Sequence, residues 1–249
     1  MPKSSRILIA IAAILLAISP VLPVWRISLI APQYPEGMGM VIRFNTIEGA
    51  KENDLENINH LNHYIGMRVI EPKDMPELQY MTPLVLVVAA FGIATAAANR
   101  RGALYAWAGV FGAAGIAGMC DFWWRTYTFG HTLDMTHAAI QIPGLAYQPP
   151  LIGVKQIANF TASAWPATGG IVIGFAALLT ATALWTSIRG SAAAAANALI
   201  AKNKAVASAE AAAEAGTQEV SRARRRVELG AERTSETRVC SETKQVSTA

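Results

Sequence analysis

Long uncharged stretches of hydrophobic residues alternate along the chain with polar segments. The hydrophobic stretches cover residues 7–25, 80–98, 103–124 and 169–188. Each is about 20 residues long, the length that an α-helix needs to cross the ~30 Å hydrocarbon layer of a bilayer. The pattern therefore predicts four transmembrane helices, with polar segments at 26–79 and 125–168 and a tail at 189–249.

The first hydrophobic stretch follows a short basic start, as a secretory signal peptide also would. Ser19, Pro20, Val21 and Leu22 do not form a small-x-small cleavage site. The stretch is also long enough to span a bilayer. We interpret residues 1–25 as an uncleaved anchor, with a signal peptide as the alternative.

Basic residues flank the ends that would share one side of the membrane if the spans alternate: Lys3, Arg6, Arg100, Arg101 and Arg189. The positive-inside rule makes that side cytoplasmic. In the first polar segment acidic residues outnumber basic ones, which suits an extracytoplasmic loop. We therefore expect a multi-pass protein of a bacterial inner membrane with both termini in the cytoplasm.

Local patterns refine this expectation. The stretch VIRFNTIEG at 41–49 alternates as a short strand does, and residues 52–67 predict an amphipathic helix with acids in its first turn. Prolines and glycines in 125–168 favour an ordered loop. Glycines at a spacing of three in the third span predict close helix packing: Gly109, Gly112, Gly115 and Gly118. The expected class is an all-α membrane protein whose two extracytoplasmic loops form one small domain.

Composition and charge narrow the function. The chain is 53% hydrophobic and 15% charged, well below the roughly 25% charge of soluble domains. No charged residue lies in the middle of a span, which argues against a pump or transporter. No P-loop, dinucleotide fingerprint or nucleophile elbow is found, and this pattern favours a non-enzymatic protein. The tail is Ala-rich and then polar, with Arg222 and Arg224 to Arg226. This composition indicates a helix followed by a solvated end. We expect no nucleic-acid partner.

The candidate chemistry lies in the two loops. At 100° per residue, Glu56, His60, His63 and Met67 fall on one helix face, and His60, His63 and Met67 could converge on one ion if the helix continues through Gly66. The second loop adds His131, Asp134, Met135 and His137, close to Cys120 and Asp121.

Imidazole, thioether and thiol groups together suit copper, above all Cu(I), better than zinc. The methionines after the first residue all fall in the loops or outer helix ends: Met38, Met40, Met67, Met75, Met81, Met119 and Met135. Histidines avoid spans in any case and methionines fill irregular cores. Structural use, or contact with quinone or lipid, therefore stays open beside a metal site.

The stretches YPEGMGM, DLENINHLNHYIGM and PGLAYQPPLIGVKQIANF resemble bacterial inner-membrane proteins associated with copper chaperones of the nitrous oxide reductase accessory type. The resemblance covers about residues 26–190. It implies copper handling or maturation of a periplasmic copper enzyme, with His60, His63 and Met67 as ligands. The chaperones' own cysteine and methionine ligand set is absent from this sequence.

Three functions remain. The leading hypothesis is a non-enzymatic accessory protein that binds copper, or docks a periplasmic copper chaperone or copper enzyme, through its loops. The second is a membrane-anchor subunit of a respiratory redox complex that contacts quinone or a cytochrome, within an oligomer or larger membrane complex. The third is a scaffold whose arginine-bearing tail recruits a cytoplasmic factor.

Overall fold

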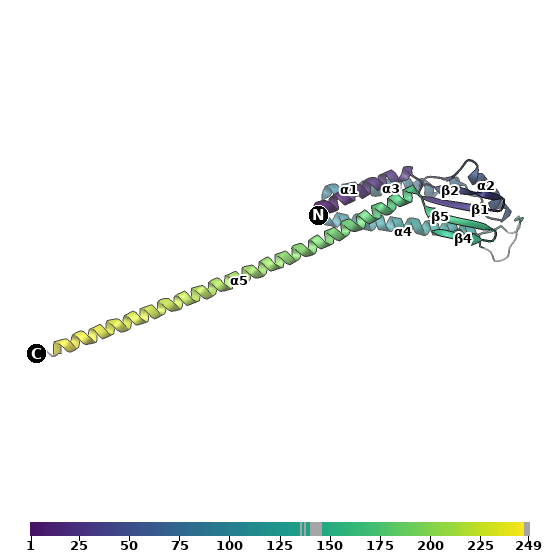
Figure 1. The fold of residues 1–249 in the computed structure, drawn as a ribbon. Helices are drawn as coiled ribbons and strands as arrows, with labels where there is room; N and C mark the ends of the chain where they lie inside the picture. Colours follow the sequence, from purple (N-terminus) through teal and green to yellow (C-terminus); the bar gives the residue numbers. More distant parts are fainter. Residues whose placement is uncertain (135, 137, 140–145, 247–249) are drawn as a thin grey trace. The chain divides into compact units, whose positions relative to one another are not determined.

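The computed structural model describes residues 1–134, 136, 138–139 and 146–246 (Figure 1). The chain divides into two compact units, Met1–Arg189 and Gly190–Ala249, and each is described by itself. The first unit holds the long helices and a β-sheet. In the second unit the chain is helical as far as Val246, and the described side chains of residues 192–210 are exposed.

Long apolar helices form one part of the first unit. They are α1 (Lys3–Ile18), α3 (Glu77–Ala98), α4 (Arg101–His131) and the start of α5 (Thr168–Val246), and a short 3₁₀ turn, η1 (Ser19–Val21), follows α1. Within the described ranges, these four helices are long and apolar enough to cross a membrane. Four helices thus lie where four spans were expected, but α1 and η1 end at Val21, before the expected end at 25, and α4 extends seven residues past the expected end at 124 (131 − 124).

The helices pack around a buried tryptophan. Trp107 on α4 is fully buried, and its indole N–H donates a hydrogen bond of 2.8 Å to the carbonyl oxygen of Val88 on α3. Gly92 makes room for the ring, because a Cβ there would lie 2.8 Å from both the Trp107 ring and the Cβ of Ala13. Ala183 of α5 belongs to the same buried cluster. Small residues on α1 and α3 therefore make room for this large side chain of α4.

A five-stranded antiparallel sheet, in the order β3-β2-β1-β5-β4, makes up the rest of the first unit. Its strands are β1 (Trp25–Ala31), β2 (Tyr34–Ile42), β3 (Ile47–Gly49), β4 (Gly153–Ile157) and β5 (Phe160–Pro166). The expectation of an all-α protein is therefore wrong. The single predicted strand at 41–49 corresponds to the end of β2 and to β3.

Strand β1 joins the two polar segments into one sheet. It pairs with β2 from the first segment and with β5 from the second, so that Ile27 lies opposite both Met40 and Ala164. The three side chains are buried in one hydrophobic cluster. The two polar segments thus contribute strands to one sheet, which lies in the same unit as the long helices.

Helix α2 (Asp54–Tyr64) packs on the sheet. The buried carboxylate of Asp54 fixes its start by accepting hydrogen bonds from the backbone N–H of Gly39 on β2, at 2.9 Å, and of Lys51, at 3.1 Å. The helix ends before Gly66, which has a φ of +76°. It therefore stops short of the expected end at residue 67, because a left-handed glycine terminates a helix. A 3₁₀ turn, η2 (Pro72–Asp74), leads into α3.

Candidate functional site

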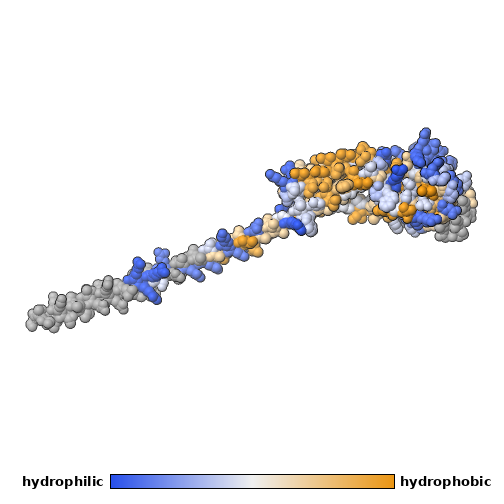
Figure 2. Space-filling view, viewed as in Figure 1, coloured by the Kyte–Doolittle hydropathy of each residue, from blue (hydrophilic) through white to orange (hydrophobic). Residues whose placement is uncertain are grey.

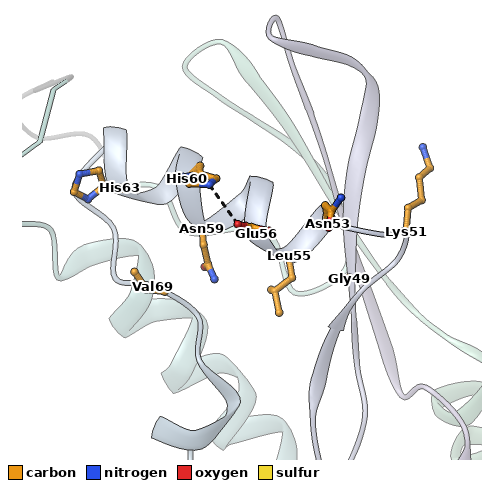
Figure 3. Close-up of a pocket in the computed structure, with 9 residues that line it drawn as sticks. All are labelled: Gly49, Lys51, Asn53, Leu55, Glu56, Asn59, His60, His63 and Val69. Carbon is orange, nitrogen blue, oxygen red and sulfur yellow. Dashed lines mark ion pairs between the residues drawn. The ribbon is translucent and has the colours of Figure 1, made fainter.

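The outer side of α2 borders an open hollow that contains two of the predicted ligands. His60 and His63 line it together with Glu56 and Asn59, and its volume is about 610 Å³ (Figure 3). The His60 Nε2 lies 3.8 Å from the Glu56 Oε1. Both side chains are about two-thirds exposed or more, so the pair is solvated and weak.

Met67 does not join the histidines. Because the helix ends before Gly66, the Met67 amide turns back to donate to the Asn62 carbonyl at 2.8 Å. The side chain packs instead against a buried cluster that includes Ile65 and Tyr147. The convergence of His60, His63 and Met67, which depended on a helix continuing through Gly66, is therefore not found.

The ligands predicted in the second polar segment are also dispersed. His131 is exposed at the end of α4, where its Nδ1 lies 2.9 Å from the Tyr127 carbonyl and its ring stacks on the Tyr127 ring at 4.0 Å. The Asp134 carboxylate accepts hydrogen bonds from the backbone N–H and hydroxyl of Thr136. Met135 and His137 lie outside the described residues. Cys120 and Asp121 sit on α4, and no group of three or more His, Cys, Asp or Glu suited to a metal was found among the described residues.

The two polar segments nevertheless meet at Gly66. The amide of Asp134 donates a 2.8 Å hydrogen bond to the Gly66 carbonyl. A Cβ on Gly66 would lie 2.5 Å from the Asp134 carbonyl oxygen and 3.0 Å from the Cβ of Ala138. A glycine is thus required here both by its φ and by the close approach of the second segment.

A second hollow of the first unit is an apolar chamber of about 1300 Å³ between the sheet and the long helices. Its sheet side includes Ile27, Leu29 and Ala162, and its helical walls come from α3, α4 and α5. Small-molecule sites usually measure about 300–1000 Å³. The chamber is therefore large enough for a long apolar ligand.

Five methionines are among the residues that line this chamber. The chamber wall includes Met40, Met67, Met75, Met81 and Met119. Flexible thioether side chains adapt to irregular apolar surfaces, so packing in the chamber wall accounts for these five methionines. Cys120 and Asp121 line the same chamber, so the structure separates the sulfur-bearing candidates there from the imidazoles of the α2 hollow.

Few charged groups reach the chamber. The guanidinium of Arg125 forms an ion pair with both carboxylate oxygens of Glu77. Arg43 pairs with Glu48 at 3.1 Å and also donates to the Val21 carbonyl. Each arginine of the lining is therefore already paired with a carboxylate.

One polar group in the chamber wall has no partner. Tyr147 is only 5% exposed, and its hydroxyl oxygen is buried without a hydrogen bond to any described residue. Its backbone N–H donates to the Gly130 carbonyl at 3.0 Å, and a Cβ on Gly130 would lie 2.5 Å from the Cα of Gln148. This close contact fixes the segment against α4. Burial raises the pKa of the Tyr147 phenol above its ordinary value.

Tyr147 was not predicted to be a functional residue. It stands in PGLAYQPP, a stretch that predicts turns, and its position in the wall depends on long-range pairing between β1 and β5. The chamber was equally unpredictable, because it is formed by residues from both polar segments and from all four helices.

Comparison with known proteins gives this chain no family. A scan against protein-family models found no match, and a search of curated proteins found none either. The resemblance to proteins associated with nitrous oxide reductase accessory factors therefore stays a prediction.

Proposed function

We propose that this chain is a multi-pass membrane protein whose chamber binds the apolar part of an amphiphile from the surrounding bilayer. Its helices carry many large apolar side chains on their outer surface, among them Ile7, Val87 and Phe175. Figure 2 shows apolar residues gathered over the helical part of the first unit and hydrophilic residues toward the sheet. A surface of this kind suits lipid on the helices and water around the sheet.

The basic residues at Lys3, Arg6, Arg100 and Arg101 support the orientation. By the positive-inside rule, they favour an orientation with both termini in the cytoplasm and the sheet outside it. In this arrangement the protein resides in a bacterial inner membrane. The chamber then lies where the outer leaflet meets the sheet.

The chamber is the observation that carries the proposed function. Its walls are parts of α3, α4 and α5 that would face the hydrocarbon layer, and its roof is the buried face of the sheet. An apolar chain could enter from the bilayer without crossing water. Burial of apolar surface inside it would contribute roughly 25 cal/mol for each Å² removed from water.

Glycines of α4 keep this space open. Gly112, Gly115 and Gly118 line the chamber, and a Cβ on any of them would meet no heavy atom within 4 Å. The stripe predicted to pack closely against another helix thus has no neighbour of this chain at that distance. An occupant taken from the membrane would fill the gap that the small residues leave.

Filling the chamber tests the proposal. Gly115→Leu places a butyl-sized side chain into the chamber, whereas Gly109→Leu, the matched control, places it in open space outside the chamber lining. Both changes remove a helical glycine and should favour the helix by up to about 1 kcal/mol each. We expect the full-length Gly115→Leu protein, purified in mild detergent, to retain less bound amphiphile by native mass spectrometry than Gly109→Leu.

The comparison has a clear negative result. Equal retention in wild type, Gly115→Leu and Gly109→Leu would show that the co-purified molecules coat the outer helix surface. A wild-type protein that retains no amphiphile in any detergent tested would also contradict the proposal. The expected role as a membrane subunit that contacts quinone is compatible with a filled chamber.

Copper binding is a second candidate function, favoured by the α2 hollow. His60 and His63 line one open space with Glu56, and two imidazoles with a carboxylate can hold a divalent transition metal. The side chains are solvent-exposed and free of tight packing. Copper delivery to a periplasmic partner would therefore use this hollow and leave the chamber untouched.

A further inference from the structure

We propose that the occupant of the chamber is an uncharged amphiphile with a carbonyl group, of the quinone class, and that the Tyr147 hydroxyl donates a hydrogen bond to that carbonyl. The proposal rests on the proposed function, because it names the ligand class of the same chamber. It concerns binding only and requires no chemical change in the ligand.

The first argument is the unsatisfied hydroxyl. Tyr147 packs against Ile65, Ile157 and Ala162, which are all buried and apolar. A buried hydroxyl without a partner costs about 1–3 kcal/mol, and native proteins satisfy nearly all such groups. No described residue accepts this hydrogen bond. A ligand acceptor inside the chamber would satisfy it.

The second argument is the charge of the lining. Its charged members are Arg43, Arg125, Glu77 and Asp121, and both arginines are paired with carboxylates. A phosphate group would need an uncommitted cation or several converging donors. Neither arginine of the lining is an uncommitted cation. An uncharged headgroup therefore fits the chamber better than the phosphate of a phospholipid.

The third argument is protonation. Burial raises the pKa of the Tyr147 phenol above its ordinary value near 10. The phenol therefore keeps its proton throughout the physiological pH range and can act as a donor. Quinones are acceptors only, so the donor and the headgroup are complementary.

The test uses the full-length protein in detergent and two probes, decylubiquinone and a phosphatidylglycerol. Tyr147→Phe keeps the ring and removes only the hydroxyl. Tyr64→Phe is the matched control, because Tyr64 is 55% exposed on α2 and does not line the chamber. Affinities are measured by ligand-dependent quenching of tryptophan fluorescence, and the thermal midpoint of the ligand-free protein is recorded for each variant.

We expect Tyr147→Phe to weaken decylubiquinone binding by about 2- to 10-fold, the effect of one hydrogen bond, and Tyr64→Phe to bind as wild type does. The thermal midpoint of ligand-free Tyr147→Phe should be unchanged or higher, because the hydroxyl has no protein partner to lose. A lower midpoint would overturn the proposal, since it would show that the hydroxyl stabilises the protein itself.

The remaining outcomes separate the two proposals. Decylubiquinone binding that is equal in wild type and Tyr147→Phe overturns the role of Tyr147 but leaves the chamber function intact. Tighter binding of phosphatidylglycerol than of decylubiquinone to the wild-type protein overturns the uncharged headgroup. If the wild-type protein binds neither probe and Gly115→Leu retains as much amphiphile as Gly109→Leu, the chamber function itself fails.

Discussion

Substitution of Gly66 by alanine tests the contact that joins the two polar segments. Gly66 has a φ of +76°, and its added Cβ would lie 2.5 Å from the Asp134 carbonyl oxygen. Ordinary van der Waals contacts of a Cβ begin near 3.4 Å, so the second segment would have to move by roughly 0.9 Å (3.4 − 2.5). Such a shift would disrupt the 2.8 Å hydrogen bond from the Asp134 amide to the Gly66 carbonyl.

Gly37→Ala is the matched control. Gly37 has a φ of +72°, almost the same, but its added Cβ would meet atoms at 3.5 Å, an ordinary distance. Both variants share the strain of a left-handed alanine, about 1–2 kcal/mol, and the lower entropy of the unfolded chain. Gly66→Ala also has the steric overlap, about 1–3 kcal/mol, and the lost hydrogen bond, about 0.5–1.5 kcal/mol. We expect it to be less stable than Gly37→Ala by about 2–4 kcal/mol.

The measurement is equilibrium unfolding of the full-length protein in mixed micelles, followed by tryptophan fluorescence. Trp25 on β1 is buried and contacts the Phe122 ring at 5.4 Å, so its emission reports on the sheet. The free energies of unfolding of the two variants are compared with wild type. Equal losses in Gly66→Ala and Gly37→Ala would refute the reasoning, because they would show that only backbone strain matters at residue 66.

Two further predictions concern the helices and the α2 hollow. Trp107→Phe should lower the free energy of unfolding by about 2–4 kcal/mol, because it leaves a cavity and removes a buried hydrogen bond. Trp124→Phe, at a 60% exposed position, should change the free energy of unfolding by no more than about 0.5 kcal/mol. Similar losses in both variants would contradict the packing described. If the hollow holds copper, elemental analysis of the double variant His60→Ala/His63→Ala should show less bound copper than the wild-type protein, whereas Met67→Ala should retain the wild-type amount. Copper loss in Met67→Ala would contradict the separation of Met67 from the two histidines.

The four long helices could be predicted closely because each depends on local sequence alone. A run of about 20 apolar residues is sufficient evidence for such a helix, and α3 ends at Ala98, as expected. The sheet could not be predicted in the same way. Strand β1 starts at Trp25, the last residue of the first hydrophobic stretch, so its apolar residues were interpreted as the end of a span and the start of a loop.

The strands of the second polar segment could not be predicted for a different reason. In β5 the alternate buried positions are Ala162 and Ala164, and alanine carries little strand signal. These small side chains are needed because β5 lies between β1 and β4 beneath a packed face. Tertiary packing therefore selected residues that local strand propensity does not favour.

The predicted convergence of His60, His63 and Met67 depended on one residue, Gly66. A helix wheel assumes that the helix continues, and the wheel placed Met67 beside the histidines only on that assumption. The left-handed glycine reverses the chain, and Met67 then enters the chamber instead. His60 and His63, which precede the glycine, keep their predicted common side. The expectation was therefore reliable up to the residue where the backbone leaves the helix.

The glycine stripe of α4 shows the limit of sequence reasoning most clearly. Small residues at helical spacing allow close approach of a neighbouring helix, and they also leave open space when no helix approaches. The sequence is the same in both cases. In this chain the sheet is continuous with α1 through Trp25 and with α5 through Pro166, so the sheet lies over the outer ends of the helices. The chamber is therefore part of the bundle and of the sheet at once, which lets one ligand keep its chain among the helices and its polar group at Tyr147.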